Sequence, residues 1–371
     1  MSLPGTVVNI LVTCKDQGPR WIRELLSEKT KFCHQIECLI TSIDRINNDP
    51  VVKERLEKLK HSIESCVENC GRVYIYGSRM YGIAKDDSDV DLYFDTGDCF
   101  SGKIADDYTR QLQLIDLFVK AANKEFIGLE IITETRIPIV RFTHDSTNFN
   151  CDLQFRSGLA VLNSELIKLY LSMDERVRWV VIAVKHWAVS FQLLCDDFST
   201  YSLIWLVLYV MMQYKIVPPI IDLWRMHQKH APIYTEGWDT RICFNYDQLK
   251  PKKSSKSSIS KLELLRYVFE FYSESNSIIL QKYVLCTVLG EILPKKTFYS
   301  TFITKVNAID NYQCQTEKFE KCETLINTNF GSFNRIELQN PLKLCNNVIP
   351  WLSDTNMNVF IDLCTKSANS M

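Results

Sequence analysis

The 371-residue sequence has no apolar run long enough to span a bilayer, which takes about 20 residues in a helix. Its longest apolar run extends from Leu203 to Met212 and predicts a buried core helix instead. No secretory signal opens the chain, and its 14 cysteines are scattered along it. We therefore expect reduced thiols in a cytoplasmic protein that makes no contact with a membrane.

An excess of charge of one sign is also lacking, because the formal net charge is −1. Such a chain must hold any nucleic acid with a local patch or cleft rather than with bulk charge. There is no internal repeat, RNA-recognition aromatic motif or zinc knuckle. The histidines and cysteines within residues 33–38 and 61–70 fall in helical patterns, and their spacings do not match common zinc modules.

The length and the 46% hydrophobic content predict two domains. The first part has a mixed pattern, with helices expected at 51–70 and 106–125, strands at 73–76, 89–94 and 151–155, and an extended stretch at 129–142 that Pro138 interrupts. After residue 160 the pattern is helical, at 176–194, 198–213, 262–272 and 278–289. The fold class is therefore predicted to be α+β.

Two aspartates alternate with apolar residues in the expected strand at 89–94. Side chains alternate faces along a strand, so Asp89 and Asp91 project together while Val90 and Leu92 point into the core. Asp152 repeats this pattern in the strand at 151–155. Neighbouring carboxylates repel one another unless cations compensate them, and oxygen ligands favour Mg²⁺ or Mn²⁺ over zinc. The three aspartates are thus candidate ligands for a pair of metal ions.

A lone Asp-x-Asp is a weak signal, because most such pairs are solvated strand edges or turns. The preceding Gly77-Ser78 turn strengthens the metal interpretation. Gly77 permits close approach of the backbone, and Ser78 opens a short helix whose free N–H groups can hold phosphate. A phosphate cradle directly before a metal-binding strand indicates nucleotidyl transfer.

These motifs resemble the DNA polymerase β-like nucleotidyltransferase superfamily. From about residue 55 to the C-terminal region, the chain is similar to the cytoplasmic terminal uridylyltransferases and their poly(A)-adding relatives. The layout expected is a small α/β nucleotidyltransferase catalytic domain at 55–160 and a larger, mainly helical and discontinuous central domain at 18–54 and 161–371. A cleft between the two domains is expected to bind the nucleotide.

The resemblance also implies nucleotide contacts, residue by residue. Asn163 corresponds to an asparagine that reaches the ribose and base edge, and Lys185 to a lysine that holds the triphosphate. In Ser199-Thr200-Tyr201, the hydroxyl residue before the tyrosine touches phosphate and the tyrosine stacks on the base. The alternatives are that Asn163 caps a helix, that Lys185 is a surface residue and that Tyr201 is core.

The recognition segment departs from the family pattern. Well-known uridylyl enzymes of the family carry histidine where this chain has Asn346, and adenylyl enzymes often carry asparagine. A second basic residue that often follows the lysine by one turn is Val189 here. The likeness of the whole chain favours UTP, whereas this motif leaves ATP open as the alternative.

The expected reaction is template-independent addition of uridines to an RNA 3′ end. In this mechanism one metal ion activates the 3′-OH, with Asp152 accepting its proton, and Ser78, Lys185 and Thr200 assist the leaving pyrophosphate. Lys252, Lys253 and Lys256 lie in a polar stretch that predicts a mobile loop, and they are candidate RNA contacts. We expect a monomer, with protein partners bound through regions outside this chain. The remaining alternatives are a catalytically silent RNA-binding relative and an oligonucleotide-signal synthase of the same superfamily.

Overall fold

The computed structural model describes residues 29–66, 71–97, 99–134, 137–195, 197–227, 230–241, 258–308, 318–330, 335–350 and 352–371. The chain forms two compact units. The sheet unit comprises Leu39–Leu171 and Met226–Leu249, and the helical unit comprises Met1–Cys38, Ser172–Arg225 and Lys250–Met371. Helices and a mixed sheet together confirm the predicted α+β class.

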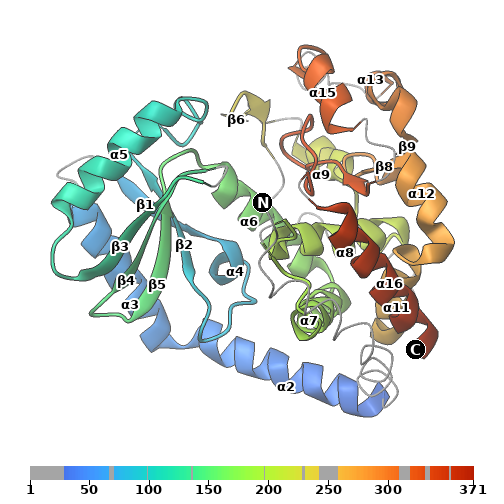
Figure 1. The fold of residues 1–371 in the computed structure, drawn as a ribbon, viewed down its shortest axis with the longest axis horizontal. Coiled ribbons are helices and arrows are strands. Elements are labelled where there is room, and N and C mark those ends of the chain that lie inside the picture. The colour runs from blue at the N-terminus through green and yellow to red at the C-terminus, as the bar shows by residue number, and fades with distance from the viewer. Residues whose placement is uncertain are drawn as a thin grey trace. The chain divides into compact units, whose positions relative to one another are not determined.

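The sheet unit is built on five strands in the order β1-β2-β5-β4-β3 (Figure 1). The β2–β5 pair is parallel, and the other three neighbouring pairs are antiparallel. Its helices and strands are α2 (Lys29–Asn48, which begins in the other unit), α3 (Pro50–Cys66), β1 (Arg72–Tyr76), α4 (Gly77–Met80), β2 (Val90–Asp95), α5 (Tyr108–Ala121), β3 (Phe126–Ile132), β4 (Ile139–His144), β5 (Phe149–Gln154) and α6 (Leu159–Met173, which ends in the other unit).

One face of this sheet is covered by α3 and α5. Leu59 of α3 and Phe118 of α5 share a single apolar core with Leu92 and Leu153 of the two parallel strands, and all four are fully buried. The alternation predicted from the sequence is confirmed on both strands, because Val90, Leu92, Cys151 and Leu153 belong to this core while the aspartates between them do not. The opposite face is therefore left for polar side chains.

The extended stretch predicted at 129–142 is two strands rather than one. β3 ends at Ile132 and β4 begins at Ile139, and the two pair antiparallel. Pro138 lies immediately before β4, where its missing N–H costs no ladder hydrogen bond.

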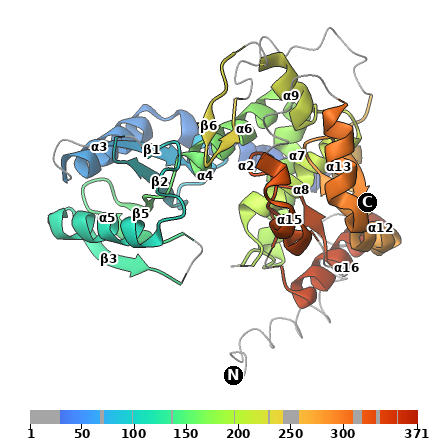
Figure 2. The same cartoon turned by 90° about the horizontal axis from the view of Figure 1, so that it is seen from above.

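The helical unit is centred on α8, whose residues from Ser202 to Met212 are all buried. This confirms the core helix predicted from the apolar run. Figure 2 shows α7, α8, α13 and α16 from above. The elements are α7 (Glu175–Ser190), α8 (Thr200–Gln213), α9 (Ile220–His227, which ends in the sheet unit), α11 (Lys261–Phe271), η1 (Glu274–Asn276), α12 (Ser277–Lys282), β8 (Tyr283–Cys286), β9 (Glu291–Pro294), η2 (Lys295–Thr297), α13 (Phe298–Asn307), α15 (Glu323–Asn329), β10 (Glu337–Leu338) and α16 (Asp354–Ser370).

The prediction of a helix at 278–289 is wrong for the second half of that segment. Only α12 is helical, and the chain continues into β8, the middle strand of a small sheet with the order β10-β8-β9. Val284, Leu285 and Cys286 are fully buried there. A short apolar run fits a buried helix and a buried strand equally well, so the pairing partners decide between them.

Residues 226–249 return to the sheet unit after the first helices of the other unit. Within them β6 (Tyr234–Thr235) and β7 (Trp238–Asp239) pair as a tight hairpin. The sequence analysis did not anticipate this return. In the part of the chain described above, none of the helices combines the length and the apolar character that crossing a bilayer requires.

Candidate active site

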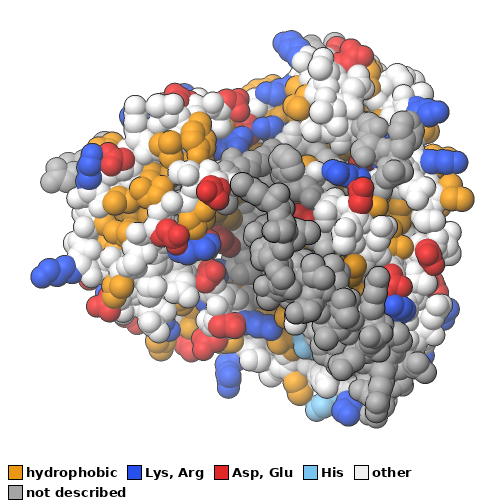
Figure 3. Space-filling model, viewed as in Figure 1, with side chains coloured by type: hydrophobic (Ala, Val, Ile, Leu, Met, Phe, Trp, Pro, Cys, Tyr) orange, Lys and Arg blue, Asp and Glu red, His pale blue; other side chains and the backbone are white. Residues whose placement is uncertain are grey.

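Asp91 and Asp152 lie directly opposite each other on neighbouring parallel strands, β2 and β5. Both side chains are half-buried on the face of the sheet that α3 and α5 leave open. The strand alternation predicted this common face, but only the register places the two carboxylates side by side. Figure 3 shows acidic side chains on the visible face of the sheet unit, with basic side chains among them.

The turn at Gly77 is shaped around Asp91. Gly77 has φ +70, and a Cβ at this position would lie 2.0 Å from Oδ2 of Asp91. Its backbone N–H donates to Oγ of Ser164 at 2.9 Å, which ties the turn to α6. Ser78 follows as the second residue of α4. Glycine is needed here both for the left-handed backbone and for the space that the carboxylate takes.

Asp89 is exposed and immediately precedes β2. The loop before it is held by Arg79, whose guanidinium donates to the carbonyl oxygens of Asp86 and Ser88. Burial lowers the pKa of Arg79, and the negative charge of Asp86 opposes this effect. Arg79 therefore fixes the backbone that presents Asp89.

The negative charges of the aspartates act on their neighbours. The pKa of the Cys151 thiol is raised first by burial and then by Asp152, Asp89 and Asp91, while Arg79 acts in the opposite direction. Burial, followed by Asp91 and Asp152, raises the pKa of Tyr76. All three predicted aspartates thus contribute to one negative field at this end of the sheet.

Arg141 of β4 neutralises part of that field. Its Nε and Nη2 donate to Oδ1 and Oδ2 of Asp152, each at 2.8 Å, and the two residues are paired in the β4–β5 register. Hydrogen bonding to Asp152 raises the pKa of Arg141. The two-pronged guanidinium contact engages both carboxylate oxygens of Asp152.

Within the described ranges, no three His, Cys, Asp or Glu side chains lie together as a set of metal ligands, and the aspartates are no exception. Asp152 instead accepts two hydrogen bonds from the guanidinium of Arg141. The donor chemistry nevertheless fits a divalent ion, because paired oxygen ligands on one sheet face are what Mg²⁺ or Mn²⁺ prefers. Asp91 and Asp152 would hold such an ion, with Asp89 on the adjoining loop.

Asn163 lies inside α6 and does not cap it. Its side-chain amide donates to the carbonyl oxygen of Leu159, one turn earlier, at 2.9 Å. The next residue, Ser164, accepts the N–H of Gly77. The structure therefore connects the segment that carries Asn163 to the turn at Gly77.

Lys185, Thr200 and Tyr201 belong to the helical unit, and each is half-buried. The Ser199 side chain caps α8 by accepting the Ser202 N–H. Tyr201 makes an edge contact with Trp205, with ring centroids 6.4 Å apart. Tyr201 and Lys185 are therefore partly accessible to solvent.

Asn346 is 7% exposed and lies in a segment held by many hydrogen bonds. Its neighbour Asn347 accepts the N–H groups of Leu338 and Ile349, which is a structural role. Ser202 of α8 donates to the carbonyl oxygen of Val348 at 3.1 Å. The start of α8 and the recognition segment are thus joined within the helical unit.

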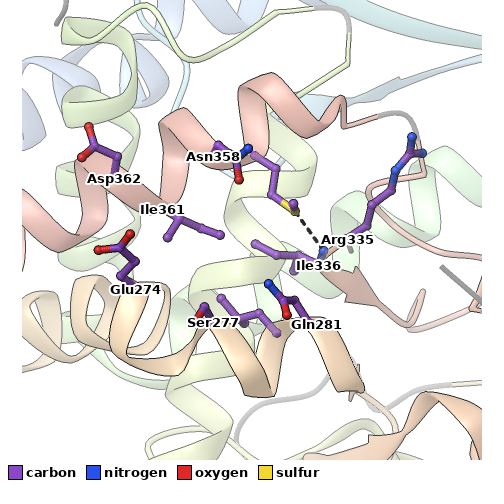
Figure 4. A pocket seen from close by; sticks show the side chains of 10 residues that line it. Glu274, Ser277, Gln281, Arg335, Ile336, Asn358, Ile361 and Asp362 are labelled. Atoms are coloured by element: carbon purple, nitrogen blue, oxygen red, sulfur yellow. Dashed lines mark hydrogen bonds between the residues drawn. The ribbon is translucent and has the colours of Figure 1, made fainter. Parts of the chain in front are cut away.

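Some predicted features lie elsewhere. Lys252, Lys253 and Lys256 fall outside the described residues. A pocket of about 430 Å³ in the helical unit, drawn in Figure 4, is lined by residues of η1, α12 and α16 together with Arg335 and Ile336. None of the predicted site residues lines this pocket.

Four residues that shape the site were not among those predicted from the sequence. Arg141 pairs with Asp152, Ser164 holds Gly77, Arg79 holds the loop before Asp89, and Tyr76 lies in the field of the aspartates. Arg141 and Tyr76 share the strand face of the aspartates by alternation, so that signal was available. Ser164 and Arg79 act through contacts that no local sequence pattern predicts.

Comparison with known proteins finds similar chains. Residues 26–172 match the family described as "Poly(A) RNA polymerase, mitochondrial-like, central palm domain". Terminal uridylyltransferase cid1 of Schizosaccharomyces pombe is 27% identical over 257 residues, which is 66% of this chain and 59% of that protein. Over residues 26–172 the chain is thus similar to the palm domain of a poly(A) RNA polymerase family, and over 66% of its length it is similar to a terminal uridylyltransferase.

Two further proteins are similar to this chain. The mitochondrial poly(A) RNA polymerase of Homo sapiens is 23% identical over 290 residues, covering 68% of this chain and 50% of that protein. A crystal structure of mtPAP in complex with GTP has the same fold, with a TM-score of 0.68 and 17% identity over 89% of this chain and 67% of the other. The chain thus spans 59% of the length of the uridylyltransferase and 50% of the length of the human poly(A) RNA polymerase.

Proposed function

We propose that this protein is a template-independent RNA nucleotidyltransferase that adds uridines from UTP to RNA 3′ ends and releases pyrophosphate. The observation that carries the proposal is the register of Asp91 against Asp152, beside a glycine turn closed against Asp91. Paired carboxylates on one face next to a tight turn suit in-line displacement at a nucleoside triphosphate.

Each side chain has a distinct part in this proposal. Asp89, Asp91 and Asp152 would hold Mg²⁺ or Mn²⁺, which lowers the charge on the α-phosphate and on the leaving group. Ser78, Lys185 and Thr200 would contact the phosphates, and Asn163 the ribose. The ring of Tyr201 would stack on the base, and stacking is sequence-tolerant because every base has a π-face. RNA and UTP are the proposed partners, in a cytoplasmic monomer.

The choice of UTP is supported by the side chain beside Asn346. The Cys345 thiol donates to Oδ1 of Asn346 at 3.4 Å. Burial, followed by the neighbouring Cys322, raises the pKa of Cys345 to about 12, so the thiol keeps its proton at neutral pH. With Oδ1 engaged, the amide of Asn346 would offer its N–H groups, which the carbonyl oxygens of uracil can accept, rather than its oxygen, which the exocyclic amine of adenine would need.

ATP is the second candidate, because a poly(A) polymerase is among the relatives and Asn346 is the residue that adenylyl enzymes of the family often carry. An incubation with a short RNA, Mg²⁺ or Mn²⁺ and equimolar UTP and ATP separates the two, since the composition of the added tail names the substrate. A tail of mostly adenosine would overturn the choice of UTP and leave the reaction class standing.

The reaction class itself is tested by removing one carboxylate. Asp91→Asn keeps the shape of the side chain but removes its charge, so extension with every triphosphate should be lost while the thermal midpoint is retained. Asp116→Asn, on the exposed face of α5, is the matched control and should extend RNA normally. Full extension by Asp91→Asn would contradict the active-site assignment.

A further inference from the structure

The hairpin of β6 and β7 has an unusual residue at its tip. Thr235 pairs with Trp238, so Glu236 and Gly237 form a two-residue loop, with φ +49 and +74. Such loops favour asparagine, aspartate or glycine at the first position, because the left-handed backbone strains other side chains. Glutamate occupies this position against that preference.

The glutamate side chain is buried against the end of the strand that carries Asp152. Its side chain is 6% exposed, and Arg156 donates to its two carboxylate oxygens at 3.3 and 3.5 Å. The Glu236 N–H donates to the carbonyl oxygen of Ser101 at 2.7 Å. A Cβ on Gly102 would lie 2.7 Å from Cγ of Glu236, so that the loop at Gly102 is also shaped around this residue.

Glu236 also determines the direction of a buried hydroxyl. Ser157, which is 2% exposed, accepts the N–H of Leu159 at the first turn of α6. Its own hydrogen goes to Oε1 of Glu236 at 2.8 Å. The carboxylate therefore fixes the serine that accepts the first N–H of α6, and Figure 2 shows β6 beside this helix.

The same helix holds the turn at the candidate site. Ser164 of α6 accepts the N–H of Gly77, and Gly77 is closed against Asp91. A contiguous series of contacts thus leads from Glu236 through Ser157 and α6 to the turn. We propose that Glu236 is a positioning residue, which fixes the start of α6 and thereby the turn that faces Asp91. This inference rests on the proposed function.

Glu236→Asn is the decisive variant. Asparagine favours the left-handed turn, so the hairpin should be retained, but its shorter side chain cannot reach Arg156 and Ser157. We expect amide hydrogen exchange to become faster in residues 157–164, with α5 as an internal control. We also expect kcat to fall about tenfold, because small displacements of catalytic groups are costly, with little loss of thermal midpoint.

Glu236→Gln is the matched control, because it keeps an oxygen acceptor for Ser157 at the same reach. It should restore slow exchange in residues 157–164 and most of the kcat. If Glu236→Asn exchanges like the natural protein in this segment, Glu236 does not position α6 and the inference is overturned. Exchange needs no substrate, so it decides this point even if the natural protein extends no RNA, a result that would refute the proposed function instead.

Discussion

At the scale of single residues, the candidate site depends on the space that glycine leaves. Gly77 and Gly82 have nearly the same backbone conformation, with φ +70 and +73. They differ in surroundings, because a Cβ at Gly77 meets the Asp91 carboxylate and one at Gly82 meets nothing within 4 Å. Alanine variants at these two positions therefore separate the free-energy cost of backbone strain from the effect of displacing the Asp91 carboxylate.

Gly77→Ala should abolish extension, whereas Gly82→Ala should retain most of it. Both changes carry the strain of a left-handed alanine, about 1–2 kcal/mol, so both should lower the thermal midpoint. Only the first also displaces Asp91. RNA extension and thermal unfolding are measured for both variants. Equal extension activity of the two would show that the close approach of Gly77 to Asp91 does not matter for activity.

Cys345 bears on base choice at the same scale. Cys345→Ala removes the donor to Oδ1 of Asn346 and frees the amide to turn. We expect the preference for UTP over ATP to fall roughly two- to fivefold. This corresponds to the net free energy of a weak hydrogen bond, about 0.5–1 kcal/mol. Cys345→Ser keeps a donor and is the control. Competition between the two triphosphates measures the effect, and an unchanged ratio in Cys345→Ala would remove the support drawn from this contact.

At the scale of elements, the first turn of α8 carries two of the predicted nucleotide contacts. Thr200 opens the helix after its Ser199 cap, and Tyr201 follows. Ser202, next in sequence, is buried and bound to the carbonyl oxygen of Val348. The helix therefore presents Thr200 and Tyr201 from a rigid base.

Tyr201→Ala should raise the KM for all four triphosphates, because a stacking ring contributes about 1–3 kcal/mol without regard to the base. The fold should be retained, since Tyr201 is only half-buried. Tyr201→Phe keeps the ring and should keep the KM within about twofold. Steady-state kinetics with each triphosphate make the comparison, and unchanged KM values in the alanine variant would assign Tyr201 a packing role with Trp205.

At the scale of the whole molecule, the near-neutral net charge requires local patches for RNA. The lysines at 252, 253 and 256 are the densest basic group that the sequence offers for this purpose. Affinity that comes from phosphate contacts falls with salt in proportion to the number of contacts.

Replacing Lys252, Lys253 and Lys256 by alanine should weaken RNA binding and flatten its salt dependence. The control replaces Lys53, Lys124 and Lys282, which are exposed at other places and change the net charge equally. Binding to a short RNA is followed over a series of salt concentrations. If the two triple variants have the same slope, net charge alone accounts for the effect and the loop makes no specific contact.

The sequence by itself determined the α+β class, the strands that carry the aspartates and the buried helix α8, because each depends on a local repeat of apolar and polar residues. Alternation also placed Asp91 and Asp152 on the open face of the sheet. It failed at 278–289, where a continuous apolar run has no period to distinguish helix from strand.

Tertiary structure alone decided which side chains meet. The register of β2 on β5 sets Asp91 opposite Asp152, and β4 brings Arg141 onto Asp152. Ser164 accepts the N–H of Gly77 from 87 residues along the chain. Glu236 accepts the hydroxyl of Ser157 from 79 residues along the chain. Such contacts arise from pairing and packing between distant segments, and local periodicity holds no information about them.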